Sequence, residues 1–266
     1  MQRKGIIASV LAAVVVAALT VLATGGPATS AGAVTASRVG PGTQLVTAGR
    51  TCSASFVFHD AQGRVYLGYA ASCATRTPSA TGCAARSLPM GTQVRLAERG
   101  RTVGYGTLRY SSLQAMRRAG VTDADTCAAN DFALVQLRGS VRRLASAAMP
   151  YWGGPSGIAP LPAPGTPVFG LARLSPGART LPRAGDVTDG DQRVVTVTTL
   201  LASTRGARGS GFLDDAGHAV GIVTAAASSG ANTVVSLADA VAFAGAHGIA
   251  GLTVVNGPGF SGSAIL

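Results

Sequence analysis

The sequence has little lysine, histidine or cysteine, and each scarcity excludes a class of site. Lys4 is the only lysine, so that every later cation is an arginine. The three histidines, His59, His218 and His247, and the few cysteines show no spacing that resembles a zinc site. No apolar run beyond the first 33 residues could span a bilayer. We therefore expect no metal, no cofactor and no membrane span in the chain beyond residue 33.

The charge balance is strongly basic, with a formal net charge of +11. The arginines are scattered along the chain, with only short pairs at Arg117-Arg118 and Arg142-Arg143. This scatter argues against a nucleic-acid-binding stripe. Two explanations remain open, a compositional bias toward arginine and a surface that binds polyanions of a cell envelope.

The first 33 residues are typical of a secretory signal peptide. Arg3 and Lys4 give a positive start, Ile6–Ala23 is an apolar run, and Ala31-Gly32-Ala33 has the small-x-small form of a cleavage site. An uncleaved membrane anchor is the alternative, because the apolar run is nearly long enough to span. We expect a secreted protein.

Four cysteines, Cys52, Cys73, Cys83 and Cys127, follow this segment. An even number of cysteines behind a signal peptide predicts two disulfides. Four cysteines allow three pairings, and the count alone does not choose among them.

The mature chain has the pattern of an all-β protein, in which short apolar runs alternate with Gly, Pro, Asp and Asn. The first set of expected strands is Ser55–His59, Val65–Ala70, Gln93–Ala97, Val103–Tyr110 and Phe132–Leu137. The second set is Pro167–Arg173, Arg193–Leu200, Gly211–Asp214, Ala219–Ala225 and Thr233–Leu237. The glycines of HDAQGR and DDAGHA indicate hairpin turns.

Between the two sets, Pro150–Pro167 contains six prolines and predicts a stiff, extended connector. A helix is expected over Ser236–His247, with Ser236 as its cap, and a shorter one over Ser112–Ala119. The Gly- and Ser-rich end from Gly257 is expected to be loose.

This organisation predicts two β-barrels and a closing helix. The expected boundaries are a signal peptide at 1–33, an N-terminal barrel at 34–140, a connector at 141–166, a C-terminal barrel at 167–235, a helix at 236–248 and a tail at 249–266.

Three stretches, taken in order, resemble the secreted bacterial chymotrypsin/trypsin-like serine peptidases, most closely the actinobacterial group. They are Cys52–Ala74 (CSASFVFHDAQGRVYLGYAASCA), Asn130–Leu137 (NDFALVQL) and Gly206–Val223 (GARGSGFLDDAGHAVGIV). The likeness covers nearly all of the mature chain. It implies a chymotrypsin-like double β-barrel of two six-stranded barrels, with an active site in the cleft between them.

The resemblance also implies where the catalytic residues would lie. The family's histidine stands in a motif like AAHC, and here residues 70–73 read AASC, so Ser72 replaces the base. The family's aspartate opens the DFAL-type strand and is retained as Asp131. The nucleophile stands in a GDSGS-type loop, and here residues 206–210 read GARGS, so Arg208 replaces the serine and Ala207 the acid.

These replacements predict a catalytically inactive chain. The guanidinium of Arg208 stays protonated and cannot attack a carbonyl, and the neutral hydroxyl of Ser72 has no useful basicity near neutral pH. The oxyanion loop, Gly206 and Arg208, carries a long cationic side chain in the approach to the site. Rescue would require Ser210 to act as nucleophile with a base from elsewhere.

Asp131 would lack its imidazole, and an unpaired buried charge costs several kcal/mol. We expect Arg208 to fill the gap and pair with Asp131, directly or through Ser72 or a water. The alternative is that Arg208 turns to solvent and backbone N–H groups or water hold Asp131. The resemblance further implies a Cys52–Cys73 disulfide, which leaves Cys83 to pair with Cys127, and places Ala202 near the base of a substrate pocket without an acidic residue.

The sequence thus predicts a secreted serine peptidase homologue that lacks catalysis and acts by binding. The expected ligand is a peptide or protein in the inter-barrel cleft, a peptidase inhibitor or an envelope polyanion. An active serine endopeptidase with non-standard catalytic residues and a paralogue without function are the alternatives. The oligomeric state is not predicted.

Overall fold

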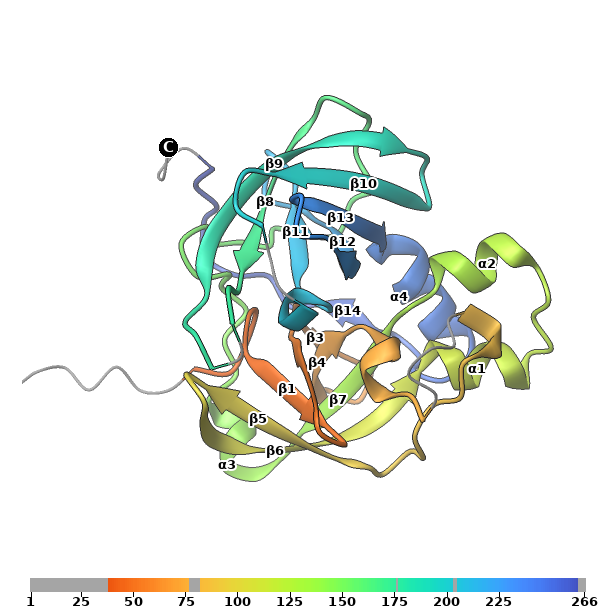
Figure 1. The fold of residues 1–266 in the computed structure, drawn as a ribbon. Coiled ribbons are helices and arrows are strands. Elements are labelled where there is room, and N and C mark those ends of the chain that lie inside the picture. The colour runs from red at the N-terminus through yellow and green to blue at the C-terminus, as the bar shows by residue number, and fades with distance from the viewer. Residues whose placement is uncertain (1–37, 77–81, 176, 203–204, 263–266) are drawn as a thin grey trace, which may run out of the picture. The chain divides into compact units, whose positions relative to one another are not determined.

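The computed structural model describes residues 38–76, 82–175, 177–202 and 205–262 (Figure 1). The expected signal peptide lies outside the described residues. Within them the chain is mostly β, with two groups of antiparallel strands and a few short helices. No helix in the described part of the chain is long and apolar enough to cross a membrane.

The first group is an eight-stranded sheet in the spatial order β14-β3-β4-β7-β6-β5-β1-β2. Its strands are β1 (Gln44–Thr47), β2 (Arg50–Ser53), β3 (Val57–His59), β4 (Val65–Tyr69), β5 (Gln93–Glu98), β6 (Arg101–Ser111), β7 (Ala133–Leu137) and β14 (Thr253–Val254). The five strands expected in this half are all present, whereas β1, β2 and β14 were not predicted. β7 is buried at every position because it lies between β4 and β6 and carries the apolar run ALVQL.

The second group is a closed six-stranded barrel in the order β10-β13-β12-β11-β8-β9. Its strands are β8 (Pro167–Ala172), β9 (Leu181–Gly190), β10 (Val194–Thr199), β11 (Gly211–Leu213), β12 (Ala219–Ala226) and β13 (Ala231–Ser236). Only β9 was not predicted. This half therefore has the six-stranded barrel that the resemblance implies.

The first group differs from the expected closed barrel, since its end strands β2 and β14 do not pair with each other. β2 instead contacts the segment that precedes β11, through the Ser53 N–H that donates to the Arg208 carbonyl at 2.9 Å. A shared apolar cluster joins the two groups, since it includes Phe56 and Phe58 of the first and Leu213 and Ile222 of the second. The burial of these side chains favours a single two-lobed unit.

The helices are α1 (Ser112–Arg118), α2 (Ala124–Ala129), α3 (Gly139–Arg143) and α4 (Leu237–Ala246), with 3₁₀ turns η1 (Ala71–Ala74), η2 (Gly82–Ala84) and η3 (Arg205–Ala207). The predicted cap of α4 is confirmed, because the Ser236 hydroxyl accepts from the Asp239 N–H at 3.2 Å. α2 was not predicted and is capped by Asp123, whose carboxylate accepts from the Thr126 N–H at 2.8 Å. α3 was also not predicted.

The connector and the C-terminal tail pack together. The indole N–H of Trp152 donates to the Gly170 carbonyl at 2.7 Å, which docks the connector on β8. The Gly257 N–H donates to the Pro155 carbonyl at 2.9 Å, and the ring of Phe260 packs edge-on against Phe169. The expectation of a loose end from Gly257 is therefore wrong as far as residue 262, because the tail finds backbone partners and an apolar site.

Candidate functional site

Ser72 and Asp131 meet at the position that the resemblance gives to the catalytic base. Ser72 lies on η1, and Asp131 lies two residues before β7. The Ser72 hydroxyl donates to one carboxylate oxygen of Asp131 at 2.7 Å, and the Ser72 N–H donates to the other at 2.6 Å. The carboxylate thus receives two short hydrogen bonds from Ser72.

A disulfide fixes η1 against the first sheet. Cys73 is bonded to Cys52 of β2, with 6.3 Å between their Cα atoms. The second disulfide joins Cys83 to Cys127, on α2, shortly before Asp131. Both predicted pairings are confirmed, and both constrain segments that present Ser72 and Asp131.

Arg208 lies on the loop between η3 and β11, and its side chain is partly buried. Two bonds from Ser53 of β2 hold this loop, since the Ser53 N–H donates to the Arg208 carbonyl and the Ser53 hydroxyl donates to the Gly206 carbonyl at 2.8 Å. Gly209 has a φ of +90°, and a Cβ there would lie 2.5 Å from the Ser53 carbonyl oxygen. The sharp turn that presents residue 208 therefore requires glycine at position 209.

Opposing effects act on the carboxyl group of Asp131. Burial raises its pKa above the usual 3.8 and is the largest effect. The hydrogen bonds from Ser72, the positive charge of Arg208 and the N–H of Ala71 favour the ionised form but do not cancel the effect of burial. Arg208 is therefore close enough to act on Asp131 through its charge.

No ion pair joins Arg208 to Asp131 in the described part of the chain. The expected direct pair is thus absent, and the carboxylate is held by Ser72 instead. The physical reason is that Ser72, although shorter than histidine, donates from both its hydroxyl and its backbone N–H. Arg208 contributes a nearby charge without a contact.

Sequence reasoning missed a second cation at this site. The guanidinium of Arg50, on β2, donates to the Ser72 carbonyl at 3.4 Å. The signal was present in the sequence, because a Cys52–Cys73 bond must bring the strand around Cys52 against the turn around Ser72. Two arginines, Arg50 and Arg208, therefore approach the Ser72–Asp131 pair from different segments.

Ser210 does not lie where a nucleophile could act. Its side chain is 1% exposed, and its hydroxyl lies 3.5 Å from a guanidinium nitrogen of Arg183 inside the second barrel. Arg183 also donates to the Asn232 amide oxygen at 2.8 Å and stands over the ring of Phe212. Burial lowers the pKa of Arg183 to about 10, so it remains a cation at neutral pH.

The three histidines all have other neighbours. His59 lies 3.1 Å from the Thr253 hydroxyl, His218 lies 3.1 Å from the Asp214 carboxylate, and the ring of His247 packs on Phe243. Ala202 lies between β10 and η3, next to residues outside the described part of the chain. No cluster of three or more His, Cys, Asp or Glu side chains among the described residues could hold a metal ion.

The fold is shared with solved structures of bacterial peptidases. No model of a known protein family matches the sequence, and no curated protein matches it. Thermobifida fusca protease A is similar with a TM-score of 0.52 and 15% identity, over 83% of this chain and 100% of that one. The Nocardiopsis protease NAPase has a TM-score of 0.52 and 16% identity, over 82% of this chain and 98% of its own.

A glutamic-acid-specific serine protease, described as using a histidine triad in substrate binding, is similar with a TM-score of 0.51 and 16% identity, over 82% of this chain and 100% of that one. At these identities the similarity establishes the fold. The chain therefore has the chymotrypsin-like double-barrel fold of bacterial serine peptidases.

Proposed function

We propose that this chain is a secreted, non-catalytic homologue of serine peptidases that binds acidic peptides at the Ser72–Asp131 site. The observation that carries the proposal is the pair of hydrogen bonds from Ser72 to the Asp131 carboxylate. A serine peptidase needs a base that takes the nucleophile's proton and returns it to the leaving group. A hydroxyl bonded to a carboxylate offers no such base near neutral pH.

The loss of either catalytic member is sufficient to abolish turnover. In one well-measured serine peptidase, removal of the nucleophile or of the histidine alone costs about 10⁶-fold, and removal of both costs little more. Here the resemblance matches Arg208 to the nucleophile, and Ser210 is buried. Only the contribution of binding and of the oxyanion loop, roughly 10³-fold over water, would remain.

The charge at the site supports an acidic ligand. Arg50 and Arg208 supply two cations, whereas the single carboxylate of Asp131 is already engaged by Ser72. The formal net charge of +11 adds a long-range attraction for anions that salt would screen. One protein of the same fold is described as specific for glutamic acid and as using a histidine triad in substrate binding. In this chain, arginines rather than histidines would recognise the acidic side chain.

Catalysis is tested with casein hydrolysis and a fluorophosphonate probe. We expect no hydrolysis and no covalent label on the full chain. The double variant Ser72→His with Arg208→Ser is expected to take up the label, whereas neither single variant does, because base and nucleophile act as a unit. Labelling of Ser210 or Ser72 in the unchanged chain would reject the proposal of an inactive homologue.

Binding is tested by fluorescence anisotropy with extended peptides that differ only in Glu against Gln. We expect the Glu peptide to bind more tightly, and Arg208→Gln to weaken it by about tenfold, the equivalent of about 1.4 kcal/mol. Arg118→Gln, on the exposed end of α1, is the matched control and should leave binding unchanged. Equal affinity for both peptides, or binding only to envelope polyanions, would argue against the peptide ligand.

A further inference from the structure

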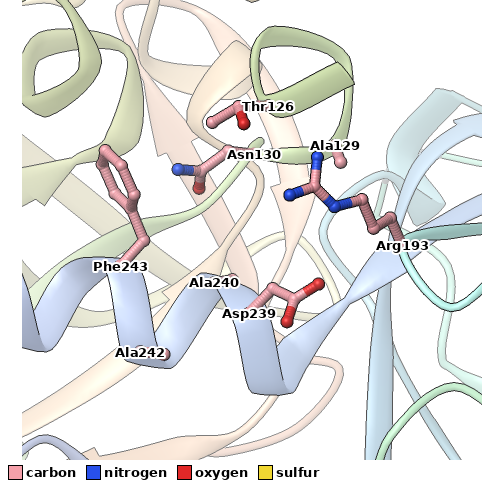
Figure 2. Close-up of a pocket in the computed structure, with 8 residues that line it drawn as sticks. All are labelled: Thr126, Ala129, Asn130, Arg193, Asp239, Ala240, Ala242 and Phe243. Carbon is pink, nitrogen blue, oxygen red and sulfur yellow. The ribbon is translucent and has the colours of Figure 1, made fainter. Parts of the chain in front are cut away.

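A separate cavity of about 230 Å³ lies between α2, α4 and the start of β10 (Figure 2). Its lining residues are Thr126, Ala129, Asn130, Arg193, Asp239, Ala240, Ala242 and Phe243. Sites for drug-sized ligands commonly measure about 300–1,000 Å³. The smaller volume here fits a metabolite of the size of one amino acid.

One lining residue, Asn130, contains a covered hydrogen-bond acceptor without a partner. Asn130 is 6% exposed, and its side-chain oxygen has no hydrogen-bond partner. Its backbone is fixed, because the Ser112 hydroxyl donates to the Asn130 carbonyl at 2.7 Å. An unsatisfied buried polar group costs about 1–3 kcal/mol. This oxygen is covered by its neighbours, so a ligand can satisfy it only if the Asn130 amide turns toward the cavity, and a hydrogen bond formed there would remove that cost.

Two opposite charges stand at the rim of the cavity. Figure 2 shows the side chains of Arg193 and Asp239 extending toward the same opening from different segments. In the described part of the chain, the ion pairs do not include Asp239, and the single one formed by Arg193 is a long contact of 3.9 Å to Asp123. The Asp123 carboxylate also caps α2, where it accepts a hydrogen bond from the Thr126 N–H.

The position of Arg193 is fixed by the backbone around it. Its N–H donates to the Asp191 carboxylate at 2.8 Å, and its carbonyl accepts from the Ser236 N–H at 2.9 Å. The second bond ties Arg193 to the residue that caps α4. The two rim charges therefore belong to adjoining, ordered segments, which limits the conformational entropy lost when a ligand binds.

The rest of the lining is apolar. Ala129 and Ala240 are buried in the wall, and the partly buried ring of Phe243 flanks the Asn130 amide on the same side of α4 (Figure 2). A simple anion would bind Arg193 but would face Asp239, and a simple cation would meet the reverse conflict. A ligand that carries both charges satisfies both groups.

We propose that this cavity binds a free α-amino acid with an apolar side chain. The carboxylate of the ligand pairs with Arg193, and its ammonium group pairs with Asp239 and donates to the side-chain oxygen of Asn130 once that amide has turned toward the cavity. The side chain of the ligand packs against Phe243 and Ala240. The site is independent of the Ser72–Asp131 pair, so failure of one proposal leaves the other standing.

Isothermal titration of the full chain with L-leucine tests the proposal. We expect a dissociation constant of about 1 mM or tighter. N-acetyl-leucine lacks the ammonium group and leucinamide lacks the carboxylate, and each should bind at least about tenfold more weakly. Equal binding of leucine and of either blocked form would overturn the assignment, and so would the absence of any heat with leucine at about 10 mM.

Variants at the rim separate binding from folding. Arg193→Gln and Asp239→Asn should each weaken leucine binding at least about tenfold and leave the melting temperature close to that of the unchanged chain. Asp215→Asn, at an exposed hairpin position, is the matched control and should bind leucine normally. Asn130→Ala should lose affinity without losing stability, because it removes the unpaired oxygen. Leucine binding that survives all three cavity substitutions would exclude this site.

Discussion

At the scale of the single residue, Asp131 is a carboxyl group whose pKa is raised by burial although a cation lies nearby. The resemblance predicts that its carboxylate would orient an imidazole, and in the structure it bonds directly to Ser72. Its charge is compensated by hydrogen bonds from Ser72 and from the Ala71 N–H and by the positive charge of Arg208, without an ion pair. We expect this incomplete compensation to make stability depend on pH.

The substitution Asp131→Asn tests that dependence. Because the folded-state pKa lies above 3.8, the carboxyl contributes stability that is fully present below pH 3.8 and is lost as the pH rises through the folded-state pKa. Asparagine keeps the shape and cannot ionise. The melting temperature of the unchanged chain should therefore fall relative to that of the variant as the pH rises above about 4.

The exposed Asp215→Asn provides the control, for which no such trend is expected. A difference between the Asp131→Asn variant and the unchanged chain that is constant with pH would show that Ser72 and Arg208 compensate the anion fully.

At the scale of the element, the loop from η3 to β11 depends on one glycine. Gly209 combines a positive φ with a backbone neighbour that leaves no room for a side chain. This loop carries Arg208 and contacts β2 of the other lobe. A change at position 209 therefore affects the candidate site and the junction between the lobes together.

Gly209→Ala should lower the free energy of unfolding by about 1–3 kcal/mol or more, because both the backbone conformation and the contact with Ser53 are strained. Gly245→Ala is the comparison, since nothing lies within 4 Å of a Cβ at this position of α4. It should stabilise the chain by about 0.5–1 kcal/mol. Chemical denaturation measures both, and a neutral Gly209→Ala would contradict the described loop.

The sequence predicts those elements whose signal is local. The ten apolar strands, the cap at Ser236 and the turns at Gly63 and Gly217 were all predicted from their own residues. β9 was missed because Pro182 and Gly185 interrupt it, and it exists through pairing with β8 and β10. β14 has two residues, too few for any periodicity.

In the candidate site, too, the sequence predicts what depends on local motifs and misses what depends on tertiary contacts. The resemblance identified Ser72, Asp131 and Arg208, because each lies in a stretch that matches a motif of the peptidase family. The bond between Ser72 and Asp131, by contrast, depends on how η1 and the start of β7 meet. The cavity of the proposed amino acid site could not be predicted from any one stretch of sequence, because Asn130, Arg193 and Asp239 come from three separate segments.

At the scale of the whole molecule, two disulfides are consistent with an extracellular chain. The three apolar clusters include one that draws on both lobes. The lobes therefore fold against each other rather than as separable modules.

Secretion is tested by expression of the full sequence in a secreting bacterium, followed by intact mass measurement. We expect the extracellular protein to begin at Val34. Ala33→Leu should block cleavage, whereas Gly32→Leu should not, because only the outer positions of the small-x-small motif must be small. A membrane-bound product that begins at Met1 would support the anchor instead.

The short strand β14 has a consequence for truncation. It pairs with β3, whose other neighbour is β4. Without β14, β3 would be the edge strand of the sheet. A chain shortened to end at Gly251 would leave the N–H and C=O groups of β3 bare. Such an open edge invites pairing between molecules, so this shortened protein is expected to self-associate even where its second barrel remains intact.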